Sequence, residues 1–343
     1  MFKQAQIDTC PMGTEDNVVV KAQNVTKTFE QWQRTGKGKN ILKNLIKPEK
    51  RKITALDDVS FAIQRGEFTA YAGPNGAGKS TTMKLLTGML LPKSGKILVL
   101  GMSPKSERVK LMRKVGVLFG NRTELWWDHP VIQSFEWKRV VWNIPKASYN
   151  RMLELVVDLL DIKGILNTFA RELSLGQRMK ADLAMMLLHE PELILLDEPT
   201  IGLDVLAKQQ MILFLKELNR EKGTTILVTS HDMDDLEAMA RRIIMVESGK
   251  IAFDGSFEDL RAATGNLCRI VITANMASVP VFPNARLLSA ESNRFTYEFD
   301  VGNTPISGIL TQIGSLEGIQ DVEIKKAPIE DVIAGLYLQW KEE

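Results

Sequence analysis

The chain has 343 residues, of which 44% are hydrophobic and 25% charged, so it can bury the core of one large domain and a small one. Its 44 basic and 42 acidic residues leave a net charge of +2, too weak to indicate nucleic acid as the main partner. No apolar run reaches about 18 residues, and the N-terminus lacks the apolar core of a signal peptide. The two cysteines, Cys10 and Cys268, fit a reducing compartment without structural disulfides. We therefore expect a cytoplasmic protein whose membrane path, if it has one, belongs to another chain.

The N-terminal part combines a tail with an interrupted β region. Residues 1–17 are polar and predict a tail, and the first strand is expected from Val18. Residues 34–52 carry eight basic residues against one Glu and interrupt an antiparallel β region. A solvated insertion is one interpretation of this segment. A patch that touches anionic lipid or a partner is the other, because four apolar residues would share one face of a short helix: Ile41, Leu42, Leu45 and Ile46.

From Glu67 onward, short apolar strands alternate with amphipathic helices. Strands are predicted at FTAYAG, KILVLG, ELILLD and TTILVTS, with a hairpin at RRIIMVESGKIAFDG. Helices are predicted at KSTTMKLLTGML, over 148–161, 176–189 and 205–221, and from Asp232. This alternation predicts a mostly parallel sheet that is covered on both faces.

The pattern changes after about Ala263. Strands at CRIVIT, RFTYEFDV and VEIKKA, with helices near 305–315 and 329–340, predict a small α+β domain, for which a ferredoxin-like sheet is a candidate. The expected organisation is therefore a tail over 1–17, a main domain over 18–263 and an accessory domain over 264–343.

The sequence GPNGAGKST lies between a predicted strand and a predicted helix, which is the context that a phosphate-binding loop requires. Its glycines allow a tight turn whose N–H groups point at the β- and γ-phosphates of a nucleotide, beside a helix N-terminus. In this interpretation the lysine bridges the phosphates and the serine hydroxyl ligates Mg²⁺. The expected ATP-binding residues are Gly73, Pro74, Asn75, Gly76, Ala77, Gly78, Lys79, Ser80 and Thr81.

A hydrophobic strand, LILLD, delivers Asp197 and then Glu198 to its C-terminal end. Doubly wound sheets place ligand chemistry beyond the carboxyl ends of their strands. We therefore expect Asp197 to hold Mg²⁺ together with Ser80, and Glu198 to polarise the attacking water as a general base. The alternative is that Asp-Glu-Pro merely ends a strand.

Three further motifs extend this set. LSLGQ, from Leu173 to Gln177, resembles the signature of ABC ATPases, IGLD resembles their D-loop, and His231 after TILVTS resembles their switch histidine. In order and spacing, the set from Val18 to about Ala263 resembles one ABC ATPase domain. That resemblance implies a P-loop NTPase fold with a mixed sheet core, an antiparallel β subdomain and a helical subdomain. More narrowly, FGNRTELWWDHP and LSLGQRMKADLAMMLLHEP resemble a bacterial, exporter-like branch in which ATPase and permease are separate chains.

The resemblance implies how such a chain works. Two domains, from a homodimer or from closely similar subunits, stack head to tail around two ATP molecules on the cytoplasmic face of the membrane. His231 would sense the γ-phosphate and steady Glu198, and Asp204 belongs to the D-loop. The signature residues of one subunit would cover the ATP held by the other; here they are Ser174, Leu175, Gly176 and Gln177.

Two positions depart from the usual residues of the family pattern. Phe29 takes the place of the aromatic residue that stacks on adenine, with Trp32 as the competing candidate. Asn121 stands where the family usually has Gln, and its amide is shorter by one methylene. The resemblance places the usual Gln near Mg²⁺ and the attacking water, so direct ligation by Asn121 is in doubt, whereas contact through a water is feasible.

Several aromatic and histidine residues have a structural role as an alternative to a functional one. Trp126, Trp127 and Trp137 follow in the segment that should face the permease, or they pack within the helical subdomain. For His129 and His189 we expect structural roles.

Three other functions compete with that of a transporter subunit. They are a soluble ABC ATPase acting on nucleic acid or ribosomes, a P-loop kinase and a non-hydrolysing regulator. The sequence leaves open the cargo, the transport direction beyond the resemblance and the role of the C-terminal domain.

Overall fold

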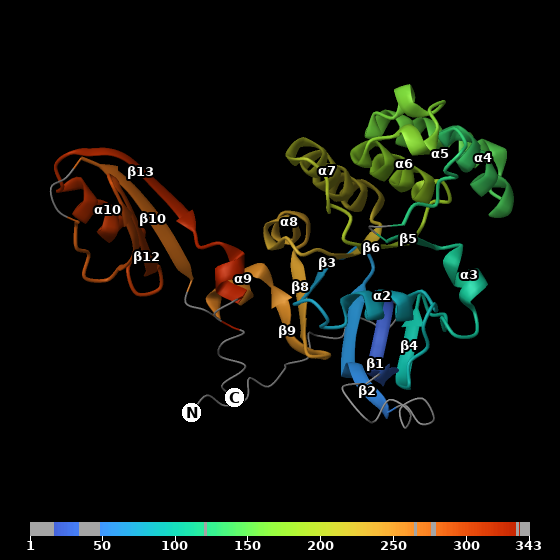
Figure 1. Ribbon diagram of the computed structural model, residues 1–343, viewed down its shortest axis with the longest axis horizontal. Coiled ribbons are helices and arrows are strands. Elements are labelled where there is room, and N and C mark those ends of the chain that lie inside the picture. The colour runs from blue at the N-terminus through green and yellow to red at the C-terminus, as the bar shows by residue number, and fades with distance from the viewer. Residues whose placement is uncertain are drawn as a thin grey trace, which may run out of the picture. The chain divides into compact units, whose positions relative to one another are not determined.

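The protein is described here by a computed structural model that covers residues 17–33, 49–119, 122–263, 266–275, 279–333 and 336 (Figure 1). The chain divides into two compact units, Met1–Asp254 and Gly255–Glu343. The tail predicted for 1–17 lies outside the described residues except for Asn17, and so does the basic insertion over 34–48. None of the helices in the described part of the chain has the length and apolar character that crossing a membrane requires.

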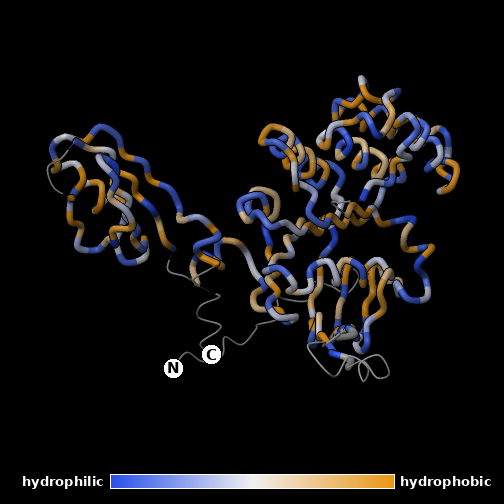
Figure 2. The backbone as a smooth tube through the Cα atoms, viewed as in Figure 1, coloured by the Kyte–Doolittle hydropathy of each residue, from blue (hydrophilic) through white to orange (hydrophobic). Residues whose placement is uncertain are grey.

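The first unit is built on a six-stranded sheet with the order β5-β6-β7-β3-β8-β9. The strand pairs from β5 to β8 are parallel. The strands are β3 (Phe68–Ala72), β5 (Val115–Phe119), β6 (Leu193–Asp197), β7 (Thr225–Thr229), β8 (Arg242–Glu247) and β9 (Lys250–Ser256). Because β3 and β7 are buried along their whole length, their sequences are continuous apolar runs with little alternation. Figure 2 shows these apolar residues gathered along the central strands.

A second, antiparallel sheet has the order β2-β1-β4, with β1 (Val18–Gln33), β2 (Glu49–Gln64) and β4 (Ser94–Val99). The ladder between β1 and β2 continues to the pair Gln33 and Glu49. Residues 49–52 therefore belong to β2, and the insertion predicted to end at residue 52 is shorter than expected, because strand pairing extends into its last basic residues.

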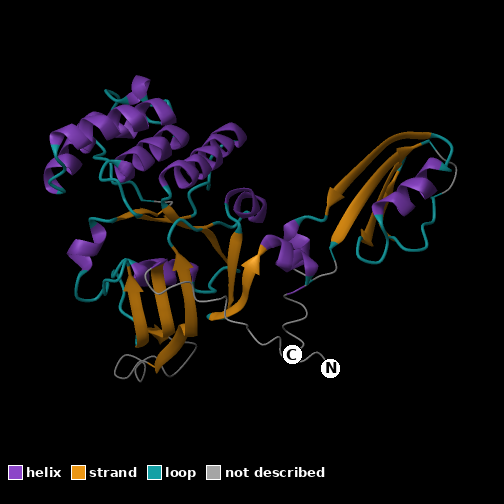
Figure 3. Ribbon diagram, turned by 180° about the vertical axis from the view of Figure 1, so that it is seen from behind, coloured by secondary structure: helices purple, strands orange, loops and turns teal. Residues whose placement is uncertain are grey.

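The first unit contains a separate group of three helices. Helices α4, α5 and α6 form a group of their own, as Figure 1 and Figure 3 show. The helices are α2 (Lys79–Leu86), α3 (Arg108–Met112), α4 (Val131–Val141), α5 (Lys146–Leu160), α6 (Leu175–Leu187), α7 (Val205–Lys222) and α8 (Met233–Met239). The predicted fold class is confirmed: a mixed sheet core, an antiparallel β subdomain and a helical subdomain are all present.

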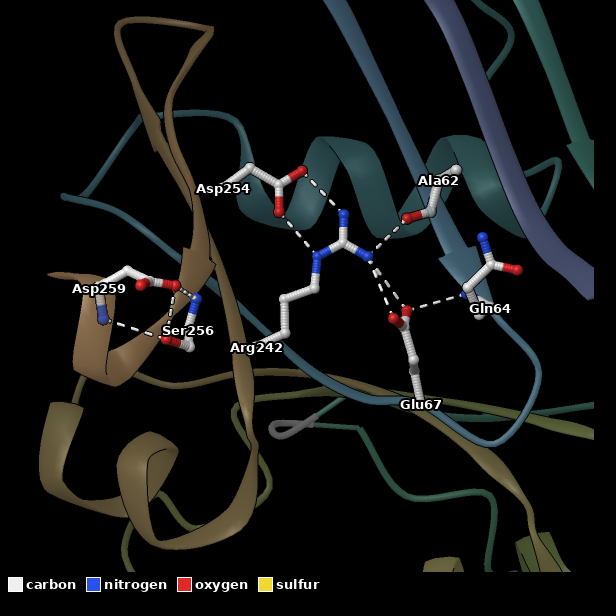
Figure 4. Close-up of polar contacts among 7 residues, drawn as sticks. All are labelled: Ala62, Gln64, Glu67, Arg242, Asp254, Ser256 and Asp259. Atoms are coloured by element: carbon white, nitrogen blue, oxygen red, sulfur yellow. Dashed lines mark hydrogen bonds and ion pairs between the residues drawn. The ribbon is translucent and has the colours of Figure 1, made fainter. Parts of the chain in front are cut away.

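One arginine ties three segments of the first unit together (Figure 4). Arg242, the first residue of β8, forms a bidentate ion pair with Asp254 of β9, with nitrogen to oxygen distances of 2.7 and 2.8 Å. Its Nη1 also donates to the Ala62 carbonyl at 2.9 Å and pairs with Glu67 at 3.1 Å. Planar guanidinium groups favour such forked contacts, so Arg242 joins the edge of the core sheet to strand β2.

The second unit is an α+β domain with a four-stranded antiparallel sheet in the order β11-β12-β10-β13. Its elements are α9 (Phe257–Ala262), β10 (Leu267–Ala274), β11 (Arg286–Glu291), β12 (Arg294–Asp300), α10 (Ile306–Gly314) and β13 (Ile319–Lys326). Because β10 is antiparallel to both β12 and β13, the β12-α10-β13 segment is a split β-α-β unit of the ferredoxin-like kind. The described segment 279–285 holds no helix. Of the helix predicted over 329–340, residues 329–333 and 336 are described and are helical.

The division between the units lies at residue 254, nine residues before the boundary predicted at 263. Helix α9 belongs to the second unit, where Arg261 Nη1 donates to the Ala327 carbonyl at 2.6 Å. Ser256 begins this helix with a capping box, accepting from the Asp259 N–H at 3.0 Å (Figure 4). A cap of this kind at the start of the segment favours helix α9 as the first element of the second unit.

Candidate nucleotide site

The predicted phosphate loop joins the end of β3 to the start of α2. Gly73 and Gly78 have φ angles of +152° and +112°, which side chains rarely adopt. A Cβ atom at Gly78 would lie 2.5 Å from the carbonyl oxygen of Ala55, and one at Gly73 would collide with the carbonyl of Val246. The loop is thus a narrow backbone cradle walled by its own chain, as a bound phosphate chain requires.

Lys79 is held at this loop by backbone carbonyls. It is buried, and its Nζ donates to the Gly73 oxygen at 2.6 Å and to the Pro74 oxygen at 3.2 Å. Burial lowers the pKa of Lys79, whereas the negative charges of Glu198 and Asp197 raise it. The buried ammonium of Lys79 therefore interacts electrostatically with Asp197 and Glu198, the two carboxylates predicted from the sequence.

The first turn of α2 follows the loop directly. Ser80 and Thr81 are half-buried there. The next residue, Thr82, donates its hydroxyl to the Gly78 carbonyl at 3.2 Å and lies 3.0 Å from the Tyr71 hydroxyl. Burial raises the pKa of Tyr71, so this phenol stays protonated and supports the helix start from β3. Tyr71 and Thr82 lie outside the glycine-rich motif, so no sequence pattern marks them as site residues.

The two carboxylates lie at the end of β6, and a neighbouring strand fixes both. Asp197 pairs with Thr229 at the end of β7, and the Thr229 hydroxyl donates to Asp197 Oδ1 at 2.7 Å. The N–H of Glu198 donates to the Thr229 carbonyl at 3.0 Å, while Glu198 itself has a positive φ of 59°. Thr229 was missed by the sequence analysis. The available signal was its position at the carboxyl end of a parallel strand, the same edge that selected Asp197.

His231 meets Glu198 as the sequence predicts. Its Nε2 lies 2.5 Å from Glu198 Oε1, and the two side chains are 47% and 22% exposed. The pair is therefore held by its own contact and is partly exposed to solvent. The structure thus brings the phosphate loop, Asp197, Glu198 and His231 to one edge of the core sheet.

The signature residues form a different kind of site. Ser174 caps α6: its hydroxyl accepts from the Gln177 N–H at 3.2 Å, and its own N–H donates to the Gln177 side chain at 3.0 Å. Ser174, Leu175 and Gln177 are exposed. Asp204 likewise caps α7, accepting from the Ala207 N–H at 2.8 Å. Within the described residues, no hydrogen bond joins the signature to the phosphate loop, so the structure does not bring these two motifs together.

A buried contact links the signature helix to the segment that follows β5. Asp182 of α6 is buried, and its Oδ1 accepts from the Thr123 hydroxyl at 2.8 Å and from the Glu124 N–H at 3.1 Å. Burial raises the pKa of Asp182 to about 6. Glu124 also pairs with the buried Lys138 of α4 at 3.0 Å. Sequence analysis missed this network, because it joins residues that are about 60 positions apart in a region without a known motif.

Asn121 lies outside the described residues, and so does the side chain of Trp32. Phe29 is 37% exposed on β1, and Lys27 Nζ lies 5.2 Å from the centre of its ring. An exposed aromatic ring suits stacking on a base, so Phe29 stays the candidate for adenine.

The three tryptophans are partly exposed, and two of them contact each other. Trp126, Trp127 and Trp137 are 38, 51 and 39% exposed, and the ring centres of Trp126 and Trp137 are 5.3 Å apart. His129 packs on Trp126 at 5.2 Å. His189 is mostly buried, with Nε2 3.2 Å from the Val115 carbonyl and a pKa that burial lowers to about 4. The surroundings of both histidines fit structural roles.

Comparison with known proteins places these observations in a family. The family described as ABC transporter matches residues 56–201. The chain is 34% identical over 254 residues to the probable multidrug ABC transporter ATP-binding protein YbhF of Escherichia coli, covering 74% of this chain and 40% of YbhF. It is 31% identical over 212 residues to the ABC transporter ATP-binding protein NatA of Bacillus subtilis, covering 62% of this chain and 86% of NatA. It is also 35% identical over 228 residues to the glucose import ATP-binding protein GlcV of Saccharolobus solfataricus, covering 64% of this chain and 64% of GlcV.

Among solved structures, the ATP-binding cassette MJ0796, a dimer bound to ADP and Pi in a post-hydrolysis state, matches with a TM-score of 0.58 and 25% identity. The match covers 69% of this chain and 98% of that one. The chain spans less than half the length of YbhF but most of NatA. The order of motifs, the geometry at the sheet edge and these matches agree, and the chain belongs to the ATP-binding subunits of ABC transporters, with an ATP-hydrolysing domain of that family.

Proposed function

We propose that this chain binds ATP and Mg²⁺ at the edge of its core sheet and hydrolyses ATP as a head-to-tail pair with a second copy or a closely similar subunit. This hydrolysis drives a separate membrane permease, and the transport direction is export. The observation that carries the proposal is the contact between Glu198 and His231 at the sheet edge that also holds the buried Lys79.

The donor set fits the ligands. The glycine cradle would take the β- and γ-phosphates, and Lys79 would exchange its carbonyl contacts for phosphate oxygens. The Ser80 hydroxyl and the Asp197 carboxylate are oxygen donors of the kind that Mg²⁺ prefers, and Asp197 is already oriented by Thr229. Bound Mg²⁺ would neutralise charge on the phosphates. Phe29 would stack on the adenine ring.

Glu198 can serve as the general base. In hydrolysis a water oxygen bonds to the γ-phosphorus, the bond from that phosphorus to the bridging oxygen of ADP breaks, and the water gives up a proton. The Glu198 carboxylate accepts that proton, and His231 fixes its orientation through the 2.5 Å contact. The shorter amide of Asn121 is proposed to reach the attacking water rather than the metal itself.

The signature supports the head-to-tail arrangement. Its helix N-terminus is exposed, and its side chains are already satisfied by the capping box within the same chain. A helix N-terminus attracts anions, and a second subunit could present it to the γ-phosphate held at Lys79. The D-loop residue Asp204 caps the neighbouring helix α7.

The partner and the direction follow from resemblance. The relatives include a probable multidrug transporter protein and a glucose import protein, so the relatives alone support neither direction. Export rests on the resemblance of the FGNRTELWWDHP segment to exporter-like systems. The exposed Trp126, Trp127 and Trp137 offer an aromatic surface that a permease on the cytoplasmic face of the membrane could contact.

Glu198→Gln tests the catalytic assignment. The variant should keep ATP affinity but lose about 10² to 10⁴ in hydrolysis rate, because a positioned base is removed while the site keeps its shape. Phosphate release and equilibrium ATP binding are measured on the purified protein. Glu247→Gln, which changes a carboxylate at the end of strand β8 in the same sheet, is the matched control and should leave the rate near the parental value. A Glu198→Gln protein that hydrolyses at the parental rate would remove Glu198 from this role.

A further inference from the structure

The second unit holds a cavity of about 460 Å³ that no part of the proposed ATP site uses. Its size lies in the range of small-molecule pockets, which is about 300 to 1,000 Å³. Five of the residues that line it are apolar or weakly polar: Leu267, Cys268, Val301, Ile306 and Ile324. Three basic residues border it, and no acidic residue lines it within the described part of the unit.

Only one of the two adjacent lysines on β13 shares the face of the cavity floor. Lys326 pairs with Cys268 of β10 in the sheet, whereas Lys325 pairs with Arg269. Because side chains alternate along a strand, Lys326 lies on the face of Cys268 and Ile324, and Lys325 lies on the opposite face. There the Lys325 ammonium pairs with Glu323 at 2.5 Å. Lys326 has no ion pair with any acidic residue in the described part of the chain.

The positive charges act at the floor of the cavity. Burial raises the pKa of the Cys268 thiol, and the charges of Lys326 and Arg261 oppose that rise. Arg261 is fixed in place, because its side chain is buried and its Nη1 donates to the Ala327 carbonyl. The cavity therefore combines an apolar lining with a fixed guanidinium and an exposed ammonium.

We propose that this cavity binds a small organic acid, an apolar body that carries one carboxylate, with the carboxylate paired to Lys326. A polyanion such as a nucleotide would desolvate charge against the apolar lining, and a neutral apolar molecule would gain nothing from the two cations. The proposal does not depend on ATP hydrolysis by the first unit.

The test is isothermal titration of the full chain with octanoate, 1-octanol and octylammonium, which share one apolar chain and differ in charge. We expect octanoate to bind most tightly and octylammonium not to bind. Lys326→Met should weaken octanoate binding about tenfold, because a charge-assisted contact is lost while the apolar stem is kept. Lys325 also borders the cavity, but its ammonium pairs with Glu323 on the opposite face of the sheet. Lys325→Met is therefore the matched control and should bind octanoate as the parent does.

Ile306→Glu gives a second, independent variant. Ile306 is 37% exposed at the first position of α10, where an acidic side chain favours the helix, so the fold should persist and the new carboxylate should repel octanoate. Lys79→Ala should bind octanoate normally, which separates this site from the ATP site. Equal octanoate affinity in Lys326→Met and Lys325→Met, unchanged binding in Ile306→Glu, or equal binding of octanol and octanoate would each overturn the proposal.

Discussion

The phosphate loop and the signature both end at the N-terminus of a helix, yet they are built in opposite ways. The loop before α2 is enclosed: its glycines are walled by carbonyls of Ala55 and Val246, and Lys79 is buried beneath it. The signature before α6 is exposed, and its polar groups bond to one another in a capping box. Both helix ends can attract an anion, but only the first surrounds one with its own chain.

This difference indicates that the phosphate loop binds a ligand within its own chain, whereas the signature contributes to a ligand site on another molecule. An added side-chain atom in the enclosed loop should impair binding, because the surrounding backbone can move aside only at a cost in free energy. An exposed helix end can tolerate side chains without loss of fold, so damage there should appear only when another molecule uses it. Substitutions at the glycines of the two sites can separate these behaviours.

The largest effect is expected at Gly78. Gly78→Ala places a Cβ 2.5 Å from the Ala55 oxygen at a φ of +112°, whereas Gly76→Ala, at a φ of +84°, meets nothing within 4 Å. Both variants pay the cost of a left-handed backbone, about 1 kcal/mol, but only Gly78→Ala must also displace the wall. We expect Gly78→Ala to lose ATP binding by more than about a hundredfold and Gly76→Ala by about tenfold or less.

Fluorescent nucleotide titration measures both affinities, and thermal unfolding shows whether each protein is folded. Similar affinities for the two variants would mean that the cradle is not a rigid wall but adapts to the added methyl group. The contrast with the signature would then lose its physical basis.

A smaller but more specific effect is expected at the signature. A Cβ at Gly176 would lie 3.7 Å from the Ala207 Cβ, an ordinary contact, so Gly176→Asp should fold, and its acid in the first turn suits the helix dipole. The same acid would repel a γ-phosphate. We expect hydrolysis to fall about a hundredfold in this variant, with ATP affinity of the isolated chain unchanged.

Mixing this variant with Lys79→Ala decides whether the signature acts on its own subunit or on a partner. In a head-to-tail pair of one variant with the other, one of the two sites has an intact Lys79 and an intact signature. About half of the pairs in an equal mixture are of this mixed kind, so phosphate release should recover to about a quarter of the parental rate. Each variant alone is the control. A mixture that stays as inactive as its components would indicate that the signature serves the phosphate loop of its own chain.

Much of the enclosed site could be read from the sequence, because its chemistry is local. The glycine loop, Lys79, and the acids after LILLD lie in short motifs next to predictable strands and helices. The fold class followed from the alternation of apolar strands and helices, since that period is a property of the chain itself. Strand β11 was missed, because all of its residues are exposed and show no alternation.

What the sequence could not predict depends on pairing between distant segments. Thr229 positions Asp197 and Glu198 from the next strand; its place at a strand end is visible in the sequence, but its partners are set by the pairing of β6 with β7. The continuation of β2 through residues 49–52 depends on pairing with β1, which overrode the charge of that segment. Asp182 contacts Thr123 only because α6 packs beside the segment after β5. Such contacts are set by tertiary packing rather than by local pattern.

The smallest effect concerns the buried carboxyl group behind the signature. The pKa of Asp182 is about 6 in the folded chain, against 3.8 ordinarily, because burial disfavours its charged form. The folded state therefore binds this proton more tightly than the unfolded state. Its stability contribution is fully present below about pH 4, is lost as the pH rises from about 4 to 6, and stays absent above that range. At pH 7.5 the charged Asp182 thus costs the folded state about 1 to 3 kcal/mol.

Asp182→Asn removes that cost while its amide oxygen can still accept from the Thr123 hydroxyl and the Glu124 N–H. We expect its melting temperature to exceed that of the parent by about 2 to 4 °C at pH 7.5 and to equal it near pH 4, where Asp182 itself is protonated. Calorimetry at the two pH values measures this, with Asp158→Asn, at an exposed position of α5, as the control that should show no such difference. A variant that is less stable than the parent at pH 7.5 would show instead that the charge on Asp182 is compensated by neighbours such as Arg178. The link between the signature helix and the segment after β5 would then depend on that charge, and pH would alter the exposed site while leaving the enclosed one unchanged.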